Sequence, residues 1–218
     1  MARGLLFLRS KQFLPYLLIV AGMGLLLFVG SQYGSMYLAQ RRMAQQWAQE
    51  QKASSSEERG PVADDGTVRL VIPKIELTSF VVEGTNRHAL LLGPGHMEHT
   101  AEPGESGNAV ISGHRDTFFR HIHELEKGDQ IYVDRGGKRI VYEVTGKKVV
   151  DPDDLSVANP TKDNELTLIT CYPTYYIGPA PKRLVVFARM ASEQEAQLSP
   201  DEASPKPQVQ PAAETSAH

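Results

Sequence analysis

The chain has 218 residues, of which 23 are lysine or arginine and 26 are aspartate or glutamate, and its formal net charge at pH 7 is −3. This length allows one or two domains. The chain has no basic patch interleaved with aromatic residues and no glycine-rich phosphate loop, so neither nucleic-acid nor nucleotide binding is indicated. The single cysteine, Cys171, excludes an internal disulfide and leaves packing, metal binding or nucleophilic chemistry as its uses.

The amino-terminal region is predicted to cross a membrane. No charged residue occurs between Lys11 and Arg41, and residues 13–33 are almost wholly apolar. About 20 such residues suffice for a membrane-spanning helix. A cleaved signal peptide is the alternative, but the apolar run exceeds the usual ~7–15 residues and no small-x-small cleavage site follows it. We therefore predict a cytoplasmic segment at residues 1–11 and an uncleaved transmembrane anchor at residues 12–34.

The positive charges that flank this span predict its orientation. Arg3, Arg9 and Lys11 precede the span closely, whereas Arg41 and Arg42 follow it at a greater distance. Because the more positive flank stays in the cytoplasm, we predict a single-pass protein of the cell membrane with its C-terminal domain on the exported side, periplasmic or extracellular. A free thiol on that side is exposed to oxidation, which favours a thiol that is needed for chemistry.

Polar segments flank the predicted folded domain. Residues 35–66 are rich in Gln and Ala and then in Ser and Glu, which predicts a stalk, helical near the membrane, followed by a linker. Residues 191–218 contain four prolines, five acidic residues, one lysine and no aromatic residue, which predicts a disordered tail outside the folded domain. The folded domain is therefore expected at residues 67–190.

Within residues 67–190, short apolar runs separated by turn residues predict one small β-rich domain. Helical periodicity is weak except at 118–125 and 87–92, and strands do not alternate with helices. This pattern favours a barrel or a sandwich over a doubly wound parallel sheet. The predicted strands are 68–72, 80–82, 109–112, 130–134, 139–150, 166–171 and 184–188.

Three predicted strands end or begin with residues suited to nucleophilic chemistry. If the strand that ends at Cys171 pairs antiparallel with the strand that follows Arg183, these two residues are neighbours. The eleven residues between them include three prolines and exceed a hairpin turn in length, which suggests a wall or a lid. His114 directly follows another strand, and strand ends are where a rigid scaffold presents reactive groups.

Each of these residues also has an ordinary structural explanation. A lone cysteine is most often a small buried hydrophobe, a histidine a hydrogen-bonded core or surface group, and an arginine at a strand start a solvated cation. Their joint occurrence favours catalysis. No metal or cofactor is predicted, because a second cysteine and familiar ligand spacing are missing, and the acidic run at 151–154 is expected to be a solvated loop. The histidines considered together with Cys171 as zinc ligands are His96, His99, His121 and His123.

At these positions the chain resembles the sortase family, membrane-anchored cysteine transpeptidases of bacterial surfaces. The resemblance covers about residues 68–189 and lies in motifs that follow the family's order and spacing. Residues 171–173 and 175–178 are most similar to class D sortases, especially the type found in Gram-negative bacteria. The motifs are LVIPKI at 70–75, GPGH at 93–96, PGESGN at 103–108, SGHRD at 112–116, GD at 128–129, TLITC at 167–171 and RLVV at 183–186.

The resemblance implies a mainly β fold, a sortase-like closed β-barrel with short helices behind one N-terminal transmembrane helix. It implies that Cys171 attacks an LPxTG-like sorting signal between Thr and Gly and forms a thioacyl-enzyme. His114 would act as general acid and then base, Arg183 would stabilise the oxyanion, and Thr170 is a candidate substrate contact. The implied partners are a surface protein with a C-terminal sorting signal, an amine-bearing acceptor and the membrane.

Two other functions stay open from the sequence. A cysteine hydrolase on the same fold would resolve the thioester with water instead of an amine, and a catalytically silent barrel would act as a binding module. Asp116, two residues after His114, either orients the imidazole or is an ordinary solvated carboxylate.

Overall fold

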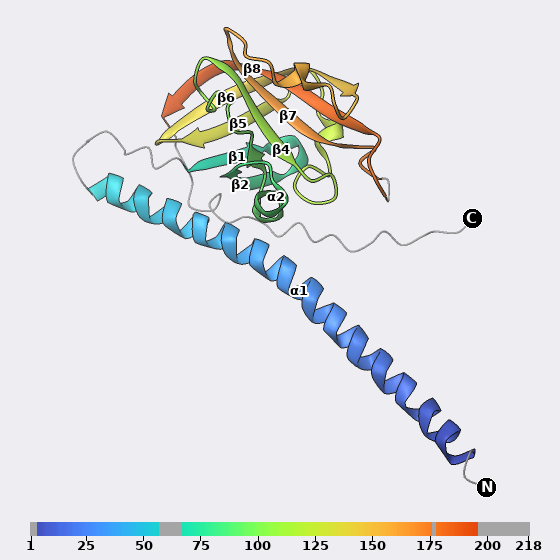
Figure 1. Ribbon diagram of the computed structural model, residues 1–218. Helices are drawn as coiled ribbons and strands as arrows, with labels where there is room; N and C mark the ends of the chain where they lie inside the picture. Colours follow the sequence, from blue (N-terminus) through green and yellow to red (C-terminus); the bar gives the residue numbers. More distant parts are fainter. Residues whose placement is uncertain (1–3, 57–66, 176–177, 196–218) are drawn as a thin grey trace, which may run out of the picture.

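A computed structural model of the chain describes residues 4–56, 67–175 and 178–195 (Figure 1). Residues 57–66 of the predicted linker lie outside these ranges. So do residues 1–3 and, from residue 196 onward, the predicted disordered tail.

The amino-terminal part of the described chain is a single long helix, α1 (Gly4–Ser56), with Pro15 inside it. Its 53 residues correspond to about 80 Å of helix at ~1.5 Å per residue. Large apolar side chains from Tyr16 to Phe28 are exposed, and the helix from Pro15 to Gln49 is long and apolar enough to cross a membrane. In Figure 1 this part of α1 projects away from the rest of the molecule.

The remaining described residues form a closed eight-stranded barrel in the order β1-β2-β3-β4-β7-β8-β6-β5. The expected mainly β fold with short helices is confirmed. The strands are β1 (Val68–Ile72), β2 (Leu77–Glu83), β3 (Gly95–His96), β4 (Gly107–Gly113), β5 (Gln130–Arg135), β6 (Lys138–Val150), β7 (Asn164–Tyr172) and β8 (Lys182–Glu195). The short helices are α2 (Arg87–Leu92) and three 3-10 turns, η1 (Pro73–Ile75), η2 (Ile122–Glu124) and η3 (Leu155–Ala158).

The barrel interior is filled by alternate side chains of the strands, which point inward at every second residue. Leu70, Ile111, Ile131 and Leu168 are among its fully buried members. Tyr142 is buried with them, and its hydroxyl oxygen accepts a hydrogen bond of 2.7 Å from the backbone N–H of Gly104. Burial raises the pKa of Tyr142 to about 12, so this phenol stays neutral and the core carries no charge there.

Three elements differ from expectation. Strand β3 has no counterpart among the predicted strands. The predicted helix at 118–125 is a series of turns ending in η2, because its buried residues Phe119, Ile122 and Leu125 recur every three positions, the period of a 3-10 helix. The last strand runs five residues past the expected end at 190, because β6 supplies hydrogen-bonding partners as far as the pair Lys138–Glu195.

Candidate active site

The pairing of β4, β7 and β8 brings the three predicted catalytic residues to one end of the barrel. Strand β4 runs parallel to β7, and the last pair in their register is Gly113–Thr170. His114 directly follows Gly113, and Cys171 directly follows Thr170. On the other side of β7, Cys171 and Arg183 are direct register partners in the antiparallel pair with β8, so the expected neighbourhood of these two residues is confirmed.

Thr170 joins two of these strands through its side chain. The residue is 2% exposed, and its hydroxyl donates a hydrogen bond of 2.7 Å to the carbonyl oxygen of Gly113. This bond spans β4 and β7 immediately before His114 and Cys171. The structure thus places the Thr170 side chain between the strands, where it holds the two candidate residues in register.

The cysteine and the arginine are both partly accessible. The Cys171 thiol is free and half-buried, and Arg183 is half-buried as well. Nη1 of Arg183 donates to the carbonyl oxygens of Lys182 at 3.0 Å and Ala180 at 3.4 Å. Both of these bonds use Nη1. Among the described residues, the other guanidinium N–H groups of Arg183 therefore remain available as donors to an anion beside Cys171.

Arg115 links the end of β4 to the loop between β7 and β8. Its Nη1 donates to the carbonyl oxygen of Pro173 at 3.0 Å, and its Nη2 donates to the carbonyl oxygen of Gly178. A guanidinium can hold two carbonyls at once because its N–H groups form a rigid fork. In the sequence, Arg115 is marked only by the SGHRD motif and by its position directly after His114.

A cavity of about 310 Å³ opens beside His114. Its walls come from three parts of the chain: α1, α2 and the loop after β4. Tyr33 and Met36 belong to α1, Leu90 and Leu91 to α2, and Asp116 follows His114 in the loop. Asp116 is exposed and lies in the wall of this cavity, a position that the sequence did not reveal.

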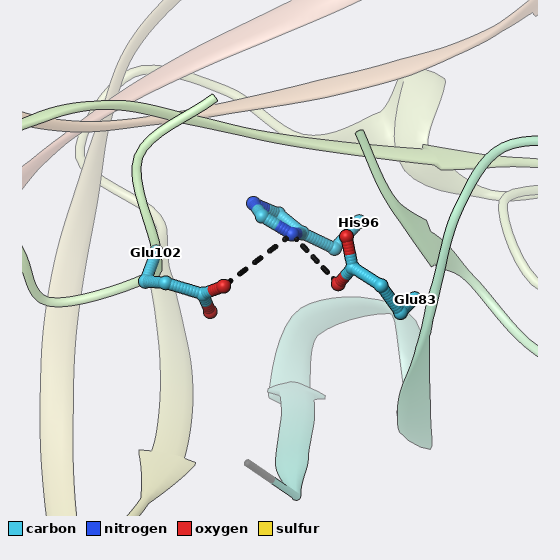
Figure 2. Close-up of side chains that lie close together, drawn as sticks. All are labelled: Glu83, His96 and Glu102. Carbon is cyan, nitrogen blue, oxygen red and sulfur yellow. Dashed lines mark hydrogen bonds and ion pairs between the residues drawn. The ribbon is translucent and has the colours of Figure 1, made fainter. Parts of the chain in front are cut away.

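A second cluster, away from Cys171, surrounds His96 (Figure 2). Its Nδ1 is 3.0 Å from Glu83 Oε2 and 3.9 Å from Glu102 Oε1. Its Nε2 lies 3.0 Å from the carbonyl oxygen of Ala101 and 3.1 Å from Thr100 Oγ1, a hydroxyl that donates its own proton to Met97. Nε2 therefore faces only acceptors and carries a proton.

Through these contacts the His96 ring connects β2, β3 and the loop before β4. In the described part of the chain, these three residues are the one group of His, Cys, Asp or Glu with ligand atoms close enough to share a metal ion. Of the histidines considered as zinc ligands, the group contains His96 but neither His99, His121, His123 nor Cys171.

Comparison with known proteins agrees with this geometry. The family model of the Sortase domain matches residues 70–191. The chain is 44% identical over 121 residues to Sortase D of Bacillus subtilis, a match that covers 55% of this chain and 61% of that protein. The chain thus spans less than two thirds of this relative's length.

Two solved structures show the same fold. Sortase A of Listeria monocytogenes superposes with a TM-score of 0.56 at 29% identity, covering 62% of this chain and 92% of that one. A Clostridium perfringens Sortase D5 transpeptidase superposes with a TM-score of 0.57 at 27% identity, covering 73% of this chain and 99% of that one.

The closed β-barrel presents a free cysteine between a histidine and an arginine at its strand ends, and its fold is the one that these solved sortases share. The chain belongs to the sortase family. The resemblance to class D sortases is confirmed by its identity to Sortase D.

Proposed function

We propose that this protein is a membrane-anchored sortase that cleaves an LPxTG-like sorting signal between Thr and Gly and transfers the acyl fragment to an amine. The observation that carries the proposal is the register of three adjacent strands. It sets His114 and Arg183 on the two sides of Cys171 at one end of the barrel.

The first step uses Cys171 and Arg183. The Cys171 thiolate attacks the threonine carbonyl carbon of the signal, a C–S bond forms, and the carbonyl oxygen becomes an oxyanion. Arg183, one strand away, donates hydrogen bonds to this oxyanion. Its permanent positive charge also offsets the negative charge that develops on this oxygen.

The second step uses His114 as a general acid. When the oxyanion collapses, the C–N bond to glycine breaks, and His114 gives its proton to the departing nitrogen. The product on the enzyme is a thioester between Cys171 and the signal's threonine. His114 is then neutral and ready to act as a base.

In the third step His114 acts as a general base. An acceptor amine attacks the thioester, His114 takes its proton, and the C–S bond breaks as the new amide forms. The Cys171 thiolate is regenerated, so atoms and charge balance over the cycle. Thr170, held in the Gly113 bond, positions both catalytic strands throughout.

Membrane attachment rests on α1. The large apolar side chains from Tyr16 to Phe28 have no cover from the rest of the described chain, and a lipid bilayer would provide it. With the positive flank inside, the barrel lies on the exported side, where surface proteins bearing the sorting signal would meet it.

The test uses the full-length protein in detergent micelles, an LPxTG peptide and intact-mass measurement, with Cys171→Ala as control. We expect an added mass equal to the acyl fragment on the parent protein alone. Glycinamide should then remove it and yield the new amide. A folded protein that forms no adduct and cleaves no peptide contradicts the proposal. If water alone releases the acyl fragment from the thioester at every glycinamide concentration, the protein is a hydrolase instead.

A further inference from the structure

Helix α1 is docked on the barrel by a buried glutamine. Gln40 is 5% exposed although it is polar. Its Nε2 donates to the carbonyl oxygens of Leu92 at 2.8 Å and Phe80 at 3.2 Å. Its Oε1 accepts from the Phe80 N–H at 2.9 Å and from the Ser79 hydroxyl at 3.2 Å. These bonds fix the position of α1 along its own axis and its rotation about that axis, relative to β2 and α2.

Two further contacts complete the docking surface. Trp47 is 6% exposed and meets the Phe80 ring edge to face, with 6.1 Å between the ring centroids. A side chain at Gly93 would come within 2.8 Å of Gln40 Nε2 and 2.6 Å of the Phe80 carbonyl oxygen, so the glutamine needs a glycine at this position.

The docked face of α1 continues into the wall of the cavity at His114. Tyr33, Gln40 and Trp47 are spaced by seven residues and therefore lie on one face of the helix, and Met36 lies on the same face one turn before Gln40. Tyr33 and Met36 line the cavity. The bonds of Gln40 therefore set the position of this wall.

The place of the cavity relative to the reacting groups indicates its use. Of the three proposed catalytic residues, His114 lines it, whereas Cys171 and Arg183 are not among its lining residues. In the proposed reaction His114 exchanges a proton with the departing nitrogen and then with the entering one. A cavity on the His114 side therefore belongs to the amine half of the reaction, not to the acyl half.

We propose that this cavity between α1, α2 and the loop after β4 is the amine-side subsite, which holds the leaving fragment first and the acceptor afterwards. The inference rests on the proposed function and adds α1 to the binding site. Tyr33, Met36, Leu90 and Leu91 give it an apolar surface for the acceptor's carbon chain.

Charged groups of the cavity define the class of acceptor. The Asp116 carboxylate lines it beside His114 and attracts an ammonium group to the base that will deprotonate it. Arg87 at the start of α2 also lines it and suits a carbonyl or carboxylate further along the acceptor. The preferred acceptor is thus a primary amine that is cationic in water and has an apolar linker and an anionic or carbonyl group beyond it.

The position of α2 in this cavity is set locally. The Asn86 side chain accepts hydrogen bonds of 3.0 Å from the N–H groups of His88 and Ala89 and so begins the helix. Its end is fixed from α1, because Gln40 donates to the carbonyl oxygen of Leu92. Leu90 and Leu91 lie between these two fixed points.

The test measures how the thioacyl-enzyme of the full-length protein divides between glycinamide and water. We expect Met36→Trp and Leu91→Trp, which fill the cavity from two different elements, to lower the ratio of transfer to hydrolysis about tenfold. Leu38→Trp is the matched control, since Leu38 is on the same helix but 54% exposed and outside the cavity. A parental ratio in both filled variants overturns the inference.

A second measurement tests the charge. Asp116→Asn should raise the concentration of glycinamide needed for half-maximal transfer about tenfold. The same substitution should leave the concentration of hydroxylamine needed for half-maximal transfer almost unchanged, because hydroxylamine is uncharged at neutral pH. An equal shift for both nucleophiles contradicts the role of the carboxylate. Formation of the adduct by the parent protein reports on the proposed function separately, so its absence and a failure of the subsite are distinguishable.

Discussion

Cys171 and Arg183 are register partners across β7 and β8, although eleven residues separate them in the chain. Their backbones are therefore fixed by the sheet and not by the loop.

The first prediction concerns Arg183. Replacement by alanine removes the proposed donors to the oxyanion, and we expect the rate of thioacyl-enzyme formation to fall about 10²–10³-fold. Stopped reactions analysed by intact mass measure this rate. Lys182→Ala is the matched control, because Lys182 precedes Arg183 but pairs with Asp151 at 2.6 Å. Equal rates in the Arg183 variant and the parent would remove Arg183 from the mechanism.

The second prediction concerns Thr170. Thr170→Val keeps the shape of the side chain but deletes the buried hydrogen bond to Gly113, leaving a carbonyl without its partner. We expect a loss of about 1–3 kcal/mol in the free energy of unfolding, and a lower rate of acylation because β4 and β7 are less firmly held. Urea denaturation measures the stability change. Thr161→Val, which removes an exposed hydroxyl bonded to the Asp163 carbonyl oxygen, should be nearly neutral by comparison.

The third prediction concerns Arg115 as a positioning residue. Arg115→Ala frees the loop that its guanidinium holds at Pro173 and Gly178. We expect faster hydrogen exchange in this loop and a rise in KM for the peptide that exceeds the fall in kcat. Arg115→Lys should restore little, since an ammonium cannot form the same fork. Arg120→Ala, at an exposed position on the same segment, provides the control, and unchanged exchange in the Arg115 variant would contradict the role.

The fourth prediction concerns the pH dependence of folding. Burial alone would raise the pKa of Asp129, but hydrogen bonds from Lys74 Nζ at 2.8 Å and the Glu126 N–H at 2.6 Å outweigh it and lower this pKa. A carboxylate with a lowered pKa stabilises the fold above its unfolded value of about 3.9, and this contribution is lost as the pH falls further.

Asp129→Asn should therefore be less stable than the parent at pH 7, with a difference that shrinks progressively below about pH 4. Thermal unfolding of the two proteins across this range provides the measurement. Asp153→Asn, at an exposed carboxylate, should show no such trend. A difference between parent and Asp129→Asn that stays constant down to pH 2 would contradict the assignment.

The sequence was sufficient for every described strand except β3. It was also sufficient for the Cys171–Arg183 neighbourhood, because β7 and β8 are consecutive and pair as a hairpin. It was not sufficient for the neighbourhood of His114 and Cys171. That depends on parallel pairing between strands more than fifty residues apart, and alternation of side chains gives no signal for which strand will be the partner. Strand β3, two residues long with a glycine, is too short to show a pattern.

The contact of α1 with the barrel was missed for a different reason. The polar composition of residues 35–56 predicts a stalk. A single glutamine in this glutamine-rich segment cannot be distinguished from the others by sequence. Only in the folded chain do the backbone groups of Phe80 and Leu92 and the side chain of Gln40 meet at hydrogen-bond distance. A buried amide of this kind is specified by its partners, which lie forty to fifty residues away.

The docking of Gln40 also sets the distance between the cavity at His114 and the apolar run of α1. Seven residues of helix, about 10 Å, separate Gln40 from Tyr33 at the end of the apolar run. With α1 in a bilayer as proposed, the entrance at His114 lies at the level of the lipid headgroups and stays there. Substrates would then be found by diffusion in two dimensions along the membrane surface, and molecules free in solution would meet the site far less often.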